Sequence, residues 1–281
     1  MSAREVHGAG LRVLGAKIRK YRVAAAVALS ERAAYRGSFL GSAFAYGLFV
    51  FVFSRIWTSV FADRSILEGY SRVQLIWYFI VAELPGVSFS GAFWTLSQDV
   101  KSGQVAYLVS KPYDFVLYSW AQGLGRAAAN CAFLAIEGIV LGLILAGLPP
   151  LAAGSAFVAV LASLTGLGLA LCVSFLLNLA LSLTAFWVEE NAAFYWIFQK
   201  LALIAGTLVP LEFLPAFAQR VAWWTPFPAL AYVPAKLFAA WPGGGVALGL
   251  LASQLAWALG AFALCEAVYA LARGRLAVNG G

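Results

Sequence analysis

The feature that most constrains the fold is a succession of apolar runs, each about 20 residues long, spaced along the whole chain. A helix of about 20 apolar residues crosses the hydrocarbon core of a bilayer, which is roughly 30 Å thick. Strands of membrane barrels differ, because they alternate apolar and polar residues over about ten positions. The runs therefore predict an all-α integral membrane protein with six transmembrane helices. We expect these helices over residues 38–60, 73–95, 127–147, 152–185, 193–211 and 246–271.

Composition limits what else the chain can contain. Of its 281 residues, 63% are hydrophobic and 11% are charged, whereas a soluble domain is about 25% charged. Six helices and their loops use most of this length. We therefore expect a single transmembrane domain over residues 1–281 and no sizeable soluble domain.

The net charge of +7 would suit a nucleic-acid partner, but the placement of the charges argues against one. Eight of the 19 Lys and Arg residues precede position 37, next to the first apolar run. This placement is typical of a topology and lipid-headgroup signal. With the N-terminus in the cytoplasm, the inner segments hold thirteen Lys and Arg residues and the outer segments hold four. We therefore expect both termini in the cytoplasm, contact with membrane lipid, and no nucleic acid.

The N-terminal segment, residues 11–36, is too polar to cross a membrane. Leu14, Ile18 and Tyr21 recur near helical spacing among basic residues, which predicts an amphipathic helix on the membrane surface. A partly disordered basic tail is the alternative. The segment has no short apolar core followed by a small-residue cleavage site, so we expect no cleaved signal peptide.

Two further patterns concern packing. Between residues 211 and 246, prolines recur at short intervals, which predicts short helices or a re-entrant segment at the outer interface rather than one span. Gly138 and Gly142 form a Gly-x-x-x-Gly motif, which allows close helix packing within the chain or between chains.

Catalytic residues are scarce. His7 is the only histidine, so no Ser-His-Asp set can form within the membrane. No Gly-rich turn ends in Lys and Ser or Thr, so a phosphate-binding loop is absent from the sequence. The three cysteines lie inside apolar runs and lack metal-site spacing. We expect no catalytic, cofactor or metal site on this chain.

Three charged residues within the expected spans are candidate pathway residues: Arg55, Glu83 and Glu137. A lone charge at mid-membrane costs at least about 2.5–3.5 kcal/mol, so each should be paired, protonated or in contact with water. Arg55 is placed to reach Glu83 in an ion pair. The carboxylates either line a substrate cavity or relay, or they hold helices together as an ion pair or as neutral carboxyls.

The polar segment after the second run resembles a known pattern. Residues 99–112 carry Ser102-Gly103, an apolar stretch and then Lys111-Pro112. This resembles the first cytoplasmic loop of ABC type-2 permeases, in their branch of about 260–280 residues with six spans. Residues 209–215 and the following Pro226-Phe227-Pro228 look like the outer segment of the same family.

The resemblance implies a transmembrane subunit of an ATP-driven exporter in the plasma membrane, from a bacterium. A second permease chain, identical or related, would complete the pathway, and an ATPase subunit dimer would bind the ATP and Mg. The substrate class would be small amphipathic or lipid-like molecules. The loop after the second span, and the turn before the fifth, would contact the ATPase. The residues implied in this coupling are Asp99, Lys101, Ser102, Gly103, Tyr107, Lys111 and Pro112, with Glu189 and Glu190 in the second contact.

Three other functions stay open on the residues alone. An ion- or proton-coupled carrier would use Glu83 and Glu137 as a relay and would need no ATPase. A membrane-embedded transferase would need a catalytic His or Asp pair at a membrane face. A structural membrane subunit would have no pathway.

Overall fold

The computed structural model describes residues 19–31, 37–89, 91–105 and 113–279. Residues 19–31 form a helix. The elements that follow are α2 (Gly37–Val60), β1 (Ile66–Leu67), β2 (Tyr70–Ser71), α3 (Arg72–Ser88), α4 (Ala92–Lys101), α6 (Phe115–Leu145), α7 (Ala156–Leu183), the 3-10 turn η1 (Thr184–Phe186), α8 (Ala192–Ala202), the π-helical η2 (Leu203–Thr207), the 3-10 turn η3 (Leu211–Phe213), α9 (Ala216–Trp223), α10 (Phe227–Leu230), α11 (Tyr232–Ala239) and α12 (Gly244–Asn279).

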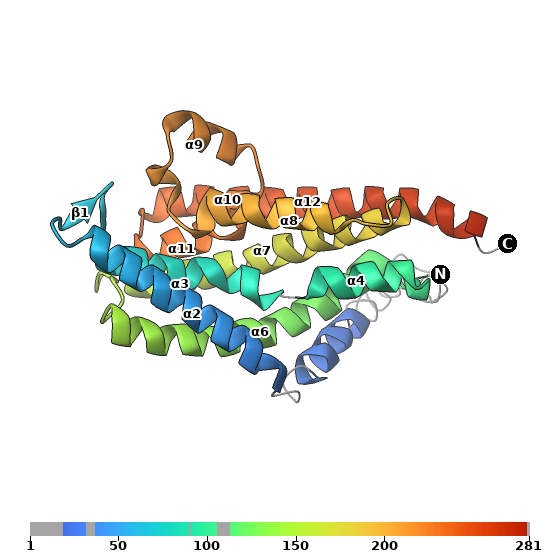
Figure 1. Cartoon of the computed structure of the whole chain (residues 1–281), viewed down its shortest axis with the longest axis horizontal. Coiled ribbons are helices and arrows are strands. Elements are labelled where there is room, and N and C mark those ends of the chain that lie inside the picture. Colours follow the sequence, from blue (N-terminus) through green and yellow to red (C-terminus); the bar gives the residue numbers. More distant parts are fainter. Residues whose placement is uncertain (1–18, 32–36, 90, 106–112, 280–281) are drawn as a thin grey trace, which may run out of the picture.

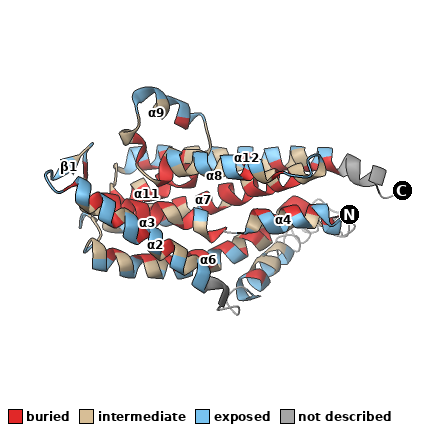
Figure 2. Cartoon of the chain, in the orientation of Figure 1, coloured by how far each residue is buried: buried red, intermediate tan, exposed pale blue. Residues whose placement is uncertain are grey.

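The long helices lie side by side in a bundle, with the β-hairpin at one end and α4 at the other (Figure 1). Among the residues that the structure describes, five stretches are long and apolar enough to cross a membrane: α2, α6, α7, α12, and α3 taken together with α4. Many residues of α2, α6, α7 and α12 are exposed (Figure 2), and they include large apolar side chains such as Phe44, which is 74% accessible, and Phe157, which is 80% accessible. The chain is thus a helical multi-pass membrane protein, because such surfaces are stable only against lipid or another chain.

The helix α3 lies at the centre of the bundle. In the most apolar window of the stretch that α3 and α4 form together, 71% of the residues are buried, against 22–33% for the other four candidate spans. It begins at a capping box, in which Ser71 Oγ accepts from the Gln74 N–H and Gln74 Oε1 accepts from the Ser71 N–H. It ends shortly after Pro85, which lacks a backbone donor. Gly91, at φ +88°, then redirects the chain into α4.

The expected continuous span over residues 193–211 is wrong in detail. The helix α8 has 11 residues and passes into η2, where Ala205 and Gly206 leave helical geometry, Gly206 with φ +151°. The hydroxyl of Tyr78 donates to the freed carbonyl of Gly206. The chain nevertheless passes from one end of the bundle to the other here, because Asn191 contacts Ser97 of α4 and Glu212 contacts Tyr70 of β2.

Other boundaries differ from expectation. The third long helix, α6, begins at Phe115 rather than near 127, because Asp114 caps it by accepting from the Leu117 N–H at 2.8 Å. The helix at 19–31 lies against it, and its Ala25 carbonyl oxygen would be 2.2 Å from a Cβ at Gly125. The rest of the expected 11–36 helix lies outside the described residues.

The proline-rich segment folds into the short helices α9, α10 and α11. The helix α9 projects from the bundle (Figure 1), whereas α10 and α11 return into it and pack against α3 and α7. Their carbonyl groups find side-chain donors: Gln254 Nε2 donates to Ala229 O at 2.8 Å, and Ser163 Oγ donates to Pro234 O at 2.9 Å. Irregular backbone within a bundle needs such partners, because lipid offers none.

The Gly-x-x-x-Gly motif is used within the chain. A Cβ at Gly138 would lie 2.4 Å from the Tyr46 hydroxyl oxygen, and one at Gly142 would lie 2.5 Å from Trp77 Cη2. These glycines therefore let α6 approach α2 and α3 closely.

Candidate functional site

A groove of about 500 Å³ opens between α2, α3, α7 and α8. We call it the lateral groove and define it by Phe49, Glu83, Asn178 and Trp196, one from each helix. Its volume falls within the roughly 300–1,000 Å³ of small-molecule sites. Most of its lining is apolar, and Glu83 is half-buried within it. The groove therefore suits a mainly apolar ligand that carries a polar or charged group.

The three candidate pathway residues are not brought together. Glu83 lines the lateral groove, but Arg55 is exposed on α2 and the two form no ion pair. Glu137 lies between α2 and α6, where a Cβ at Gly47 would be 2.8 Å from its Oε1. Its Oε2 is buried without a hydrogen-bond partner among the described residues. The position of Glu137 favours a role in helix packing, while that of Glu83 favours a role in the groove.

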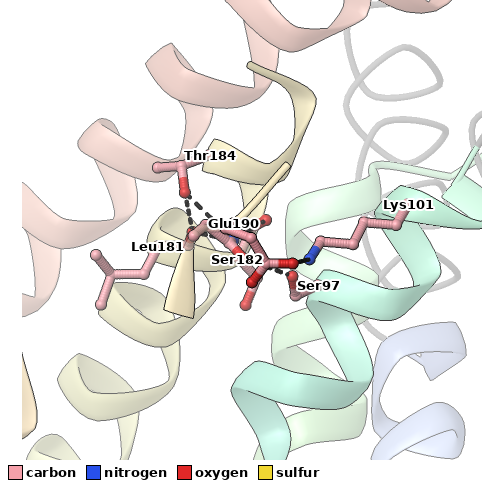
Figure 3. Close-up of polar contacts among 7 residues, drawn as sticks. Ser97, Lys101, Leu181, Ser182, Thr184 and Glu190 are labelled. Carbon is pink, nitrogen blue, oxygen red and sulfur yellow. Dashed lines mark hydrogen bonds and ion pairs between the residues drawn. The ribbon is translucent and has the colours of Figure 1, made fainter. Parts of the chain in front are cut away.

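At the α4 end, the two segments expected to contact an ATPase meet. Asn191, which is 1% accessible, precedes α8 and accepts a hydrogen bond from Ser97 Oγ of α4 at 2.9 Å. Its Nδ2 donates to the carbonyl oxygens of Leu181 and Ser182 at 3.3 and 3.4 Å and to Thr184 Oγ1 at 3.3 Å. Figure 3 shows the residues around this junction. One buried amide therefore links α4, the end of α7 and the start of α8.

The coupling residues suggested by the family resemblance surround this junction where they are described. Lys101 Nζ lies 3.8 Å from Glu190 Oε1 in an ion pair (Figure 3), and the Glu190 side chain is 87% accessible. Glu189 is also exposed. Ser102 and Gly103 form the turn that ends α4, with Gly103 at φ +75°. Asp99 is half-buried one turn earlier. Tyr107, Lys111 and Pro112 lie outside the described residues.

Sequence reasoning missed the residues that carry this junction. Asn191 follows the two glutamates, and Ser97 begins the polar segment after the second run, but neither pattern shows that the two side chains meet. They are 94 positions apart. The available signal was an Asn between two glutamates and an apolar run, since an amide side chain that becomes buried needs several partners.

At the opposite end, a second polar cluster joins the hairpin to the turn η3 and the helix α11. Lys236 Nζ of α11 donates to Glu212 Oε1 at 2.8 Å and to the Tyr70 hydroxyl at 2.7 Å. The hydroxyls of Tyr232 and Tyr70 donate to the two Glu212 oxygens at 2.8 and 3.1 Å. These polar groups are hydrogen-bonded to one another, so the cluster holds the segments together rather than forming an open binding site. We call the cluster of Tyr70, Glu212, Tyr232 and Lys236 the clasp.

The part of the chain that the structure describes has no assembled metal site and no assembled site for nucleophilic catalysis. That part contains no group of three or more His, Cys, Asp and Glu residues placed to hold a metal ion. The thiols of Cys131, Cys172 and Cys265 are free, and those of Cys131 and Cys265 are buried in the bundle. The geometry instead supports binding in a groove and mechanical contact at one end.

Comparison with known proteins agrees with this geometry. The model of the ABC-2 family transporter proteins matches residues 44–277, which cover both the lateral groove and the junction at Asn191. No curated protein and no solved structure matches the chain. The match covers well over half of the chain, so the chain belongs to the ABC-2 transporter family and is a membrane subunit of the ABC-2 permease type.

Proposed function

We propose that this chain is the transmembrane subunit of an ATP-driven exporter of the plasma membrane, working with a second permease chain and a separate ATPase dimer. ATP and Mg would bind on the ATPase. The observation that carries the proposal is the junction at Asn191, because it ties the two expected ATPase-contacting segments to three helices at once. A push on either segment would move α4, α7 and α8 together, as rigid elements transmit motion through packed contacts.

The positions of the basic residues favour one orientation of the chain in the membrane. The helix at 19–31 and the C-terminal end of α12 lie toward the α4 end of the bundle (Figure 1), and Arg19, Lys20 and Arg22 begin that helix. Basic segments favour the cytoplasmic side. We therefore place the Asn191 junction and both termini in the cytoplasm, and the Glu212 cluster outside. The segment between the Asn191 junction and the Glu212 cluster then acts as the sixth crossing.

The surroundings of the lateral groove favour the binding of a second permease chain. On either side of it, α2 and α8 expose large apolar side chains, including Phe44 and Leu48 on α2 and Ile197 on α8. A second chain against these faces would close the groove into a pathway. The apolar lining with Glu83 favours an amphipathic or lipid-like substrate that carries a cationic group, because a half-buried carboxylate gains most from a cation.

The test is a mild-detergent purification of this chain from its native membrane, with partners identified by mass. A co-purifying P-loop ATPase is the expected result, and a second permease of similar size would show that the pathway is a heterodimer. Recovery of the chain alone, under conditions that keep a known ABC exporter intact, would overturn the proposal.

A proton-coupled carrier is the second candidate, and the position of Glu83 in the groove is what favours it. Such a carrier would transport in vesicles that contain this chain alone when a proton gradient is imposed. An exporter of the proposed type would transport only when the ATPase and ATP are present.

A further inference from the structure

A second cavity, of about 290 Å³, lies beside the break between α3 and α4 and is walled by α4, α6 and α7. We call it the polar cavity and define it by Thr95, Asp99, Gln122, Arg126 and Asn130. It adjoins the lateral groove at Phe89, which lines both. Its lining is much more polar than that of the groove, so it suits a different ligand.

Opposite charges face the polar cavity without meeting. Asp99 of α4 is half-buried and Arg126 of α6 is exposed at the rim. They are close enough for their charges to interact, yet neither side chain forms an ion pair or a hydrogen bond with the described residues. A charged group withdrawn from water without a partner is costly. A half-buried carboxylate and a rim-exposed guanidinium that line one cavity and are not paired with each other are complementary to a ligand bearing both charges.

Depth places the cavity at the level of lipid headgroups. The helix α6 ends at Leu145, 19 residues after Arg126. At 1.5 Å per residue this separation is about 29 Å, which matches the roughly 30 Å of the hydrocarbon core. With the end of α6 at one membrane interface, Arg126 and the cavity lie at the other.

The surroundings agree with this depth. The basic helix at 19–31 packs against α6 at Gly125, next to Arg126. Basic residues at this level attract lipid phosphates. The volume of about 290 Å³ also falls just below the range of sites for drug-sized molecules, so it admits a headgroup rather than a whole amphiphile.

We propose that the polar cavity binds a zwitterionic ammonium–phosphate group, as in phosphoethanolamine, with the ammonium at Asp99 and the phosphate at Arg126. The source is either a membrane phosphatidylethanolamine, whose headgroup enters from the bilayer, or a free molecule from the aqueous side. The site lies within one chain. It therefore does not depend on a second permease or on an ATPase, and it stands or falls apart from the proposed exporter function.

The test is native mass spectrometry of the full chain in detergent, titrated with dioleoyl phosphatidylethanolamine. The matched probe is the N-acetylated lipid, which keeps the acyl chains and the phosphate but loses the ammonium. Because the two lipids share their chains, binding to the apolar outer surface cancels in the comparison. We expect the N-acetylated lipid to bind about tenfold more weakly, which corresponds to about 1.4 kcal/mol.

Variants locate the binding. Arg126→Gln and Asp99→Asn should each weaken binding of the unmodified lipid about tenfold, and either one suffices if the other does not fold. Arg64→Gln, in the exposed turn after α2 at the opposite end, is the control and should bind as the unchanged protein does. Equal binding of the two lipids, or unchanged binding by the folded Arg126 and Asp99 variants, would overturn the proposal and leave a cavity that holds water only.

A third probe separates the two sources. Glycerophosphoethanolamine carries the same headgroup without acyl chains. If it competes with the lipid at similar concentration, the cavity takes the free molecule from water. If only the lipid binds in a manner that depends on Arg126, the cavity takes a membrane headgroup. Both results support the zwitterion site. If neither probe binds, the proposal is overturned.

Discussion

Lys236 and Glu212 form a 2.8 Å ion pair that joins the helix α11 to the turn η3 at the hairpin end of the bundle. The lysine side chain is 17% accessible and the glutamate side chain 34%. Lys236 also lies over the ring of Tyr70, 4.6 Å from its centroid. The pair and Tyr70 therefore hold together three separate segments: the hairpin, the turn η3 and the helix α11.

The first prediction concerns pH. Burial raises the pKa of Glu212, but the hydrogen bond and charge of Lys236, a backbone hydrogen bond and the hydrogen bond from Tyr232 together lower it more, so the net pKa lies below its ordinary value. A carboxyl whose pKa is lowered by folding stabilises the fold above its unfolded pKa, about 4.3. That contribution is lost as the pH falls through the lowered value. We expect Glu212→Gln to unfold at lower temperature than the unchanged protein at pH 7, with the difference shrinking toward pH 3. A difference that is constant with pH would contradict this assignment.

A second prediction uses the lysine. Lys236→Met should leave Glu212 without its cation and destabilise the chain by about 1–3 kcal/mol. Thermal unfolding in detergent measures the effect. Arg220→Gln in the exposed helix α9 is the control. Arg220 Nε donates a hydrogen bond of 3.4 Å to Ala216 O within the same helix. Equal shifts for the two variants would show that the clasp contributes nothing specific.

The third prediction tests the close approach of α6. Gly142→Ala should destabilise the chain by about 1–3 kcal/mol, because its Cβ would lie 2.5 Å from Trp77 Cη2. Gly249→Ala on α12 is the matched control, since a Cβ there meets nothing within 4 Å. Alanine is the better helix former by about 1 kcal/mol, so the control should be neutral or stabilising. Equal unfolding midpoints for the two variants would exclude the packing role.

How far the sequence predicted this fold depends on the range of the interactions involved. The apolar runs over 38–60 and 152–185 predict the positions of α2 (Gly37–Val60) and, less closely, α7 (Ala156–Leu183), because hydrophobicity is a local property. The break at Gly206 was not predictable, since it depends on a hydrogen bond from Tyr78, 128 positions away. The same holds for the clasp, in which Lys236 and Tyr70 are 166 positions apart. The sequence also predicted that Arg55 reaches Glu83. In the structure Arg55 lies on the exposed face of α2, and a sequence does not show which face of a helix is exposed.

The fourth prediction compares neighbours at the Asn191 junction. Asn191→Ala would leave buried Ser97 Oγ without its acceptor and should cost about 1–3 kcal/mol. Glu190→Gln removes an exposed ion pair and should cost less than about 1 kcal/mol. In the complex with its ATPase, Asn191→Ala should also lower the amount of substrate moved per ATP hydrolysed. If Asn191→Ala loses no more stability than Glu190→Gln and moves the same amount of substrate per ATP, the Asn191 junction does not couple ATP hydrolysis to transport.

The last prediction concerns the groove and separates it from helix packing. Glu83 lines the lateral groove, whereas Glu137 lies between α2 and α6 and lines neither described cavity. Glu83→Gln should therefore reduce transport of cationic amphiphiles more than that of neutral ones, because it removes the carboxylate and keeps the side-chain shape. Glu137→Gln should leave that preference unchanged, with any effect falling on stability. Transport assays in vesicles, with one cationic and one neutral amphiphile of the same apolar body, measure the ratio directly. If Glu83→Gln leaves the ratio unchanged, the carboxylate does not select the substrate and the groove acts through its apolar walls alone.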